Sequence, residues 1–283
     1  MLEMLINPKR AEREPWELFF IGLVYASLSI GLVHFIFASD PVLKEASGIL
    51  VVTFTVMFSM PFIFYTLKLE EKRIDENNKS ISLLNKHRNA IYAFLWLFFG
   101  FLVAFSFWNM VLDTPTLNFQ VKTYCQINRP GNIDSCAAEY GIKQTSFTGN
   151  AVGANRLFMI FTNNIYVLIF TLAFSFIFGA GAIFVLAWNA SVIAAAIGIF
   201  TKSDLAYLPI GLARYMIHGI PEIASYFIVA LAGGLVSVAV IKHEFGKDKF
   251  WEVLQDSLNL IVLSIIVLLI AALIEVYVTP LLF

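Results

Sequence analysis

Three ionisable residues stand four positions apart in one of the most apolar parts of the sequence: Arg214, His218 and Glu222. A further acid, Glu275, lies inside the last apolar run, Leu258–Phe283. Ionisable side chains are costly in hydrocarbon, so they normally pair, face the interior of a helix bundle or line a pathway. We therefore expect the four residues to form one polar cluster, in which two acids balance Arg214 and a protonated His218.

This combination of residue types is compatible with three kinds of site. In a structural site, the four side chains neutralise one another and stabilise the local helix geometry. In a channel or transporter, His218 and the two acids form a proton or ion pathway. A metal or hydrolase site is the third interpretation, but no His-Glu-x-x-His motif, Gly-x-Ser-x-Gly elbow, phosphate loop or dinucleotide fingerprint supports it. We therefore predict no metal, no cofactor and no enzymatic activity, and the first two interpretations stay open.

The sequence around these residues predicts a broken helix. One continuous helix would place Arg214, His218 and Glu222 on a single face. Pro221 argues against continuity, because it removes a backbone hydrogen bond and disfavours helix at the preceding residue. We expect a break near Gly219, with Pro221 opening the next helix and Glu222 in its first turn, where the helix dipole favours a carboxylate.

The composition indicates the class of protein. The chain has 283 residues, of which 59% are apolar and 14% are charged, and its formal net charge is −1. A soluble domain of this size needs far more polar surface. The sequence has no excess of basic residues that would suggest nucleic acid as a partner. We predict an all-helical, multi-pass protein of the cell membrane, embedded in the lipid bilayer.

Hydropathy predicts about seven membrane segments, because a crossing takes about 20 apolar residues. Asn189–Phe200 is short for a crossing, and with Leu205–Ile220 it is expected to form a short broken or re-entrant pair. The other segments are expected at Trp16–Phe37, Gly48–Leu67, Ile91–Leu112, Ile165–Leu186, Pro221–Ile241 and Leu258–Val278.

The distribution of Lys and Arg predicts the orientation, because cytoplasmic loops carry an excess of both. Twelve of the 19 positive residues lie before the first segment, in the Lys68–Arg88 loop or in the Lys242–Trp251 loop. If all three are cytoplasmic, the chain crosses seven times, with its N-terminus inside and its C-terminus outside. This requires Asn189–Phe200 to cross; a re-entrant hairpin would place Lys242–Trp251 outside.

The segment Asp113–Gly153 is the only sizeable soluble stretch, and its composition is typical of a loop. It is predicted to be external, and it holds both cysteines of the chain, Cys125 and Cys136. A cysteine pair confined to an external loop predicts a disulfide in an oxidising compartment. Such a bond would stabilise the loop by roughly 3 kcal/mol. Two unrelated free thiols are the alternative.

Several short motifs resemble those of a known family, the stage II sporulation protein M family of membrane proteins. The resemblance begins at Asn85, and its more specific parts are the His-Gly-x-x-Glu block at 218–222 and the Ile-Glu and Thr-Pro pairs near the C-terminus. Ile217 and Ala190 depart from the Pro and Gly usual in the family. The motifs are Asn85-Lys86-His87-Arg88, Phe161-Thr162-Asn163-Asn164, Phe178-Gly179-Ala180-Gly181, Leu186-Ala187-Trp188-Asn189, His218-Gly219-Ile220-Pro221-Glu222 and Ala272–Pro280.

The resemblance implies both a domain division and a role. Residues 1–84 would be a two-span N-terminal extension with a cytoplasmic loop, and residues 85–283 the family domain, with an external loop at 113–153. The bacterial namesake resembles a scaffold that recruits cell-wall remodelling enzymes, and relatives occur in organisms that do not sporulate. The resemblance therefore implies a non-enzymatic scaffold or assembly factor in envelope or membrane remodelling, with protein partners or as a homo-oligomer. An ion or small-solute channel or transporter is the alternative.

Overall fold

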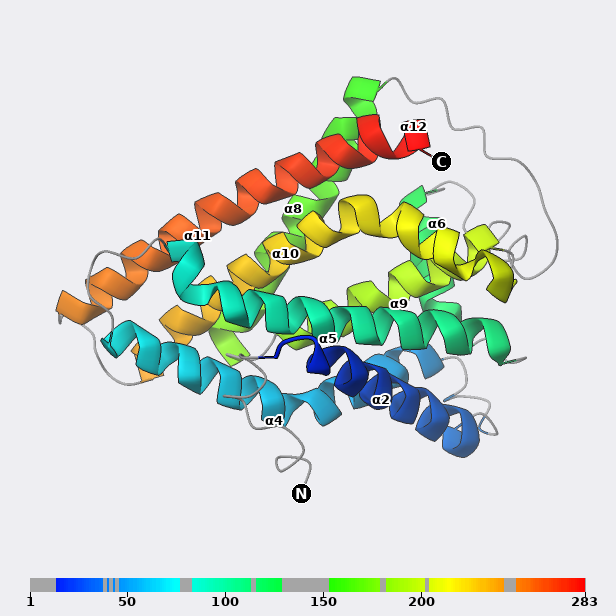
Figure 1. Cartoon of the computed structure of the whole chain (residues 1–283), viewed down its shortest axis with the longest axis horizontal. Coiled ribbons are helices and arrows are strands. Elements are labelled where there is room, and N and C mark those ends of the chain that lie inside the picture. Colours follow the sequence, from blue (N-terminus) through cyan, green and yellow to red (C-terminus); the bar gives the residue numbers. More distant parts are fainter. Residues whose placement is uncertain are drawn as a thin grey trace.

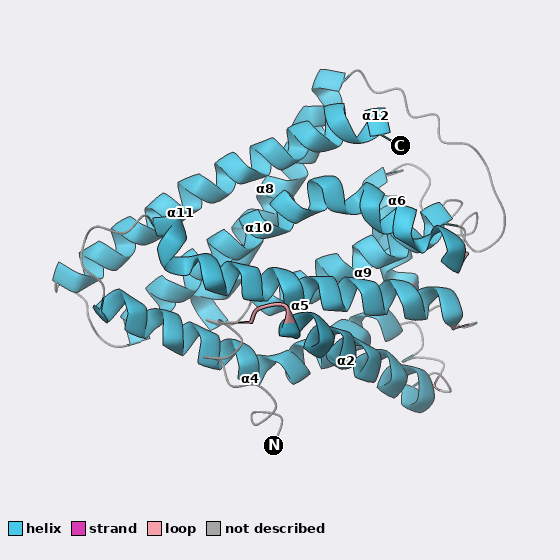
Figure 2. Ribbon diagram, in the orientation of Figure 1, coloured by secondary structure: helices cyan, strands magenta, loops and turns pink. Residues whose placement is uncertain are grey.

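The fold is entirely helical in the part of the chain that the structure describes, which confirms the predicted all-α class. The structure is a computed structural model that describes residues 14–37, 40, 43, 46–76, 83–112, 116–128, 153–178, 182–201, 204–241 and 248–282. Figure 2 shows helix throughout these residues, apart from short connecting segments.

The long helices form one bundle (Figure 1). Six of them contain a segment long and apolar enough to cross a membrane, and a shorter apolar stretch, Ser47–Phe62, lies in α4. The chain is therefore a multi-pass membrane protein. The long helices are α2 (Glu17–Leu32, continued by the π-helix η2, Val33–Phe37), α4 (Ser47–Glu76), α5 (Leu83–Val111), α8 (Gly153–Phe178), α9 (Ala182–Thr201), α10 (Leu208–Ile241) and α11 (Asp248–Leu273).

The predicted boundary between the fourth and fifth membrane segments was wrong. The sequence analysis placed one segment at Ile165–Leu186 and a short one at Asn189–Phe200, whereas α8 ends at Phe178 and the next helix, α9, begins at Ala182. With 20 residues, α9 is long enough to cross a bilayer, so its length no longer argues for a re-entrant hairpin. The error arose because hydropathy stays high through both helices.

The predicted helix break at Gly219 and Pro221 was also wrong. Helix α10 runs without interruption through both residues and is 34 residues long. Pro221 removes only the bond that its N–H would have donated to the carbonyl of Ile217. In membrane helices this loss is tolerated, because neighbouring groups and small backbone adjustments satisfy the freed carbonyl.

The bundle is tightest where α2 crosses α5. A Cβ added to Gly100 would lie on the carbonyl oxygen of Phe19 and 2.9 Å from the Cα of Gly22. A Cβ added to Gly22 would lie on the carbonyl oxygen of Leu97. The two backbones therefore touch, as small residues allow between membrane helices. One apolar core includes residues from both sides of the proposed division at 84/85, and that division stays a prediction.

The predicted external loop contains a helix that the sequence analysis did not predict. This helix, α6 (Asn118–Asn128), lies against the first turn of α4. The buried Gln120 donates from Nε2 to the carbonyl oxygen of Gly48 at 2.9 Å, and Ser47 Oγ donates to the carbonyl oxygen of Thr116 at 3.1 Å. One hydrogen bond from α6 and one to the turn that precedes it thus connect this segment to the start of α4, although the sequence of α6 lacks strong periodicity. Cys125 is buried in α6, while Cys136 lies outside the described residues, so their pairing stays a prediction.

Candidate functional site

The structure places the predicted cluster residues where α10 meets the C-terminal end of the chain. Because α10 is continuous, Arg214, His218 and Glu222 share one helix face. Glu275 lies in the π-helix η4 (Ile274–Val278), which follows α11 and precedes α12 (Thr279–Leu282). Helix α10 contacts all three of these elements. We call the following residues the polar strip: Arg214, His218, Glu222 and Tyr226 of α10, with Glu275 and Thr279.

His218 connects α10 to the C-terminal turn. Its Nδ1 lies 3.3 Å from Thr279 Oγ1. The Thr279 hydroxyl donates to the carbonyl oxygen of Ile274 at 3.2 Å, and the backbone N–H of Thr279 donates to the same oxygen. These contacts join the middle of α10 to the turn that begins at Ile274.

Glu222 is held by the helix turn that follows it. Tyr226 donates from Oη to Glu222 Oε1 at 3.0 Å, and the Tyr226 side chain is 1% exposed. Ser225 Oγ donates to the backbone carbonyl of Glu222 at 2.6 Å. Glu222 and Tyr226 are therefore paired within one turn of α10. A contact between Glu222 and Glu275 stays a prediction.

Arg214 makes a different contact. Its guanidinium carbon lies 4.7 Å from the centre of the Phe200 ring, near the end of α9. This cation–π contact joins α9 to α10, one turn before His218. The contacts described so far thus link His218 with Thr279, and Glu222 with Tyr226, whereas Arg214 reaches the neighbouring helix. Whether all four predicted residues act as one site stays a prediction.

The polar strip extends from near the start of α10, at Arg214, to the middle of this helix, at Tyr226. The apolar segment that contains these residues runs from Leu205 to Ser237, so Glu222 lies near its middle. Glu275 lies within the last apolar segment, Phe250–Leu282. The four predicted residues are half-buried within the protein.

Glu275 lies in a π-helical turn, a feature that often occurs at functional sites. The following proline accounts for this turn: Pro280 has no N–H to donate to the carbonyl of Val276. The backbone N–H of Thr279 instead bonds five residues back, to Ile274. The Thr-Pro pair is visible in the sequence, but no local rule assigns it a role. Tyr226 was not among the predicted site residues, and its i+4 spacing from Glu222 was the available signal.

Comparison with known proteins places these residues in a family. The family model described as stage II sporulation protein M matches residues 18–280. The chain belongs to the stage II sporulation protein M family. The matched region begins within α2, so it includes the two segments that the sequence analysis regarded as an extension.

One relative is an uncharacterized protein of the archaeon Methanocaldococcus jannaschii. It is 36% identical to this chain over 126 residues, which cover 43% of this chain and 69% of the relative. No solved structure matches the chain. The family is thus established, while the molecular role must be argued from the residues themselves.

Proposed function

We propose that this member of the stage II sporulation protein M family is a non-enzymatic membrane scaffold. The observation that supports this proposal is the dense apolar packing at the centre of the bundle. Phe98, Phe101 and Phe105 of α5 are at most 1% exposed and pack in one core with residues of α2, α4, α9 and α10. Rigid aromatic packing of this kind favours a structural bundle, because a conducting protein needs a polar or hydrated path.

The outer helices offer surfaces for partners. The apolar segments of α8 and α11 are the least covered within the protein among the six full-length candidate spans. Exposed apolar side chains on α8 include Phe158, Tyr166 and Phe170. In a bilayer such faces contact lipid or other helices. We propose that the helices of partner proteins, or of a second copy of the chain, bind to these faces.

A channel or transporter remains the second candidate, and the polar strip favours it. A histidine, two acids and a π-helical turn are the kind of arrangement that membrane proteins use to move protons or ions.

Reconstitution separates the two candidates. The full chain, purified and placed alone in liposomes, is expected to show no proton or cation flux above that of empty liposomes. A photoreactive amino acid at Tyr166 should cross-link in cells to a protein of one defined mass, whereas the same group at the buried Phe101 should not. Flux that is lost in a Glu222→Leu variant would support the transporter instead.

The proposed orientation can be tested in whole cells. We predict that α9 crosses the membrane, with the N-terminus cytoplasmic, the Thr201–Asp204 segment outside and the Lys242–Trp251 loop inside. Single cysteines at positions 203 and 247, in a chain lacking Cys125 and Cys136, should react with an impermeant maleimide from opposite sides. Reaction of both from the same side would contradict seven crossings.

We also predict that Cys125 and Cys136 are bonded to each other in an external loop. Cys136 should not react with maleimide in intact cells until a reductant is added, and Cys125, which is buried, should react only when the protein is both reduced and unfolded. Labelling of Cys136 without reductant would show free thiols, and labelling only after lysis would place the loop inside. Loss of the bond should lower the unfolding free energy by roughly 3 kcal/mol.

A further inference from the structure

The register of the C-terminal turns against α10 places two acidic residues of the polar strip at the same level. A short connection joins α10 to α11, so the two helices run antiparallel, and η4 and α12 return to the first half of α10 (Figure 1). The contact between His218 Nδ1 and Thr279 Oγ1, at 3.3 Å, fixes this register. Glu222 follows His218 by about one turn, and Glu275 precedes Thr279 by about one turn. In antiparallel helices these two turns lie side by side.

Both acidic side chains reach the surface of the bundle within apolar segments. Glu222 and Glu275 are only half-buried within the protein. Glu222 lies near the middle of its apolar segment, and Glu275 lies within the last one. Exposed apolar side chains stand two residues away on each helix, because Ile220 is 41% exposed and Tyr277 is 50% exposed. This face therefore meets other helices or lipid, and an acidic side chain there needs a polar partner.

The basic residues of the polar strip do not match the two acids in position. Arg214 precedes Glu222 by about 12 Å along α10, and its guanidinium carbon lies 4.7 Å from the centre of the Phe200 ring on α9. Glu222 Oε1 accepts a hydrogen bond from the neutral hydroxyl of Tyr226 instead. A protonated His218, one turn away, would balance one of the two negative charges. Charge complementarity at the level of Glu222 therefore favours a further cation from outside the chain.

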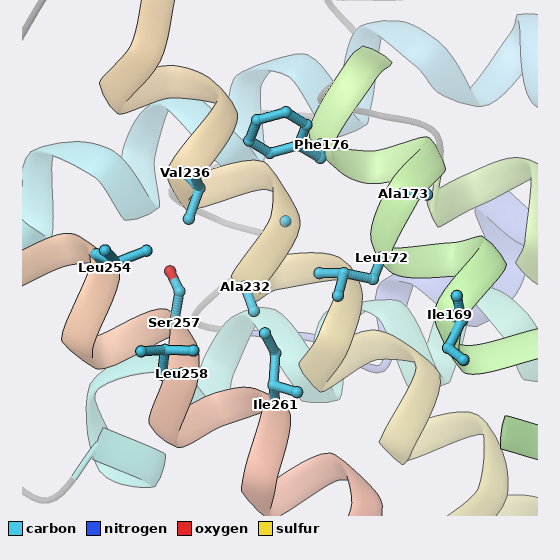
Figure 3. A pocket seen from close by; sticks show the side chains of 11 residues that line it. Ile169, Leu172, Ala173, Phe176, Ala232, Val236, Leu254, Ser257, Leu258 and Ile261 are labelled. Carbon is cyan, nitrogen blue, oxygen red and sulfur yellow. The ribbon is translucent and has the colours of Figure 1, made fainter. Parts of the chain in front are cut away.

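The second half of α10 meets its neighbours through apolar side chains instead. Ala232, Gly233 and Val236 line a pocket of about 320 Å³ with residues of α8 and α11 (Figure 3). The other side chains that line it are apolar except for Ser257, which is 2% exposed and so out of reach of a partner. The charged side chains of α10 lie only in its first half, so a partner that recognises charge must bind there.

We propose that the face of α10 and η4 around Glu222 and Glu275 binds a transmembrane helix of a partner protein, through a lysine or arginine of that helix. The long methylene stem of either residue lets the cation reach a half-buried acid while the stem packs against apolar neighbours. A second copy of the chain fits less well. Two symmetric copies in one membrane present the same side chains at the same depth, which brings Glu222 toward Glu222 rather than toward a cation. This inference rests on the proposed scaffold function and names the chemistry of its partner.

A synthetic partner helix tests the surface directly. The full chain is reconstituted in liposomes with a labelled transmembrane peptide of leucines that carries one lysine, at its centre or one turn to either side. Resonance energy transfer between the protein and the peptide measures binding. We expect at least one lysine peptide to bind about tenfold more tightly than an otherwise identical peptide with leucine in place of the lysine, the effect of one charge-assisted hydrogen bond. Equal binding of all the peptides would overturn the proposal.

Neutral variants show whether the two acids are responsible. Glu222→Gln and Glu275→Gln should each weaken binding of the lysine peptide about tenfold and leave binding of the leucine peptide unchanged. Glu222→Gln still accepts the hydrogen bond from Tyr226, so it should remain folded, which thermal unfolding checks. Glu252→Gln is the matched control, because Glu252 is an exposed acid near the other end of α11, and it should alter neither affinity. The proposal is wrong if both strip variants bind the lysine peptide as the native chain does.

Cross-linking in cells separates failure of this inference from failure of the scaffold proposal. A photoreactive amino acid at Tyr277 should capture a membrane protein, and replacing the lysine or arginine in its membrane segment with leucine should abolish the cross-link. A cross-link from Tyr166 but not from Tyr277 would overturn this inference and leave the scaffold proposal in place. Capture of a second copy, or of a protein with no basic residue in its membrane segments, would also overturn it. Cation flux through the native chain that Glu222→Gln abolishes would overturn both proposals.

Discussion

Gly100→Leu and Gly22→Leu are each expected to lower the unfolding free energy by about 3 kcal/mol, and either change should separate α2 from α5. The physical reason is that the added Cβ meets backbone rather than a flexible side chain. At Gly100 it would lie on the carbonyl oxygen of Phe19, and at Gly22 on that of Leu97. Neither helix can yield without moving as a whole. The midpoint temperature of thermal unfolding in detergent should fall by about 6–12 °C, because a chain of this size loses about 2–4 °C for each kcal/mol of stability.

Gly31 provides the matched control within α2. A Cβ at Gly31 would have nothing within 4 Å, so Gly31→Leu should be neutral or slightly stabilising, since leucine has the better helix propensity. Equal behaviour of Gly31→Leu and Gly100→Leu would contradict the close approach of α2 and α5. A large loss at Gly22 and Gly100 would further show that the first membrane helix is required for the stability of the rest of the bundle.

The class and the approximate number of membrane segments could be predicted because both depend on local composition, and the family could be predicted from short sequence motifs. The ends of individual helices could not be predicted. Hydropathy measures how apolar a stretch of sequence is, and it does not indicate where one helix ends and the next begins. The stretch from Ile165 to Phe200 contains two helices whose apolar character is nearly uniform, so the predicted boundary fell after Leu186 instead of after Phe178. Gly179 and Gly181 are of the residue type that commonly follows a helix end, and they were the available signal.

The predicted helix break was wrong because tertiary packing outweighs a local rule. Proline normally ends a helix, but Pro221 lies inside α10, because the surrounding bundle compensates for one lost hydrogen bond. The contact between His218 and Thr279 joins residues 61 positions apart, and no local pattern indicates that they meet. The bond from Tyr226 to Glu222 was within reach of sequence analysis, since side chains at i and i+4 are neighbours on a helix.

Glu222→Leu is expected to lower the unfolding free energy by about 1–3 kcal/mol, because it leaves the Tyr226 hydroxyl buried without an acceptor. Tyr226 is 1% exposed and its Oη lies 3.0 Å from Glu222 Oε1, so water cannot readily replace the carboxylate. Glu222→Gln should be close to native in stability, because its amide oxygen still accepts the bond from Tyr226.

The double variant Glu222→Leu with Tyr226→Phe tests whether the hydrogen bond between these two residues stabilises the fold or belongs to a transport pathway. It removes both partners, which can be nearly neutral, so most of the stability lost in Glu222→Leu should return. A double-mutant cycle measured by thermal unfolding should give a coupling free energy of about 1–2 kcal/mol between positions 222 and 226. Additive losses would mean that the hydrogen bond does not stabilise the fold. If the double variant regains stability and still cross-links to its partner through α8, Glu222 has a structural role in a scaffold. If the native chain conducts ions and the double variant does not, Glu222 belongs to a transport pathway.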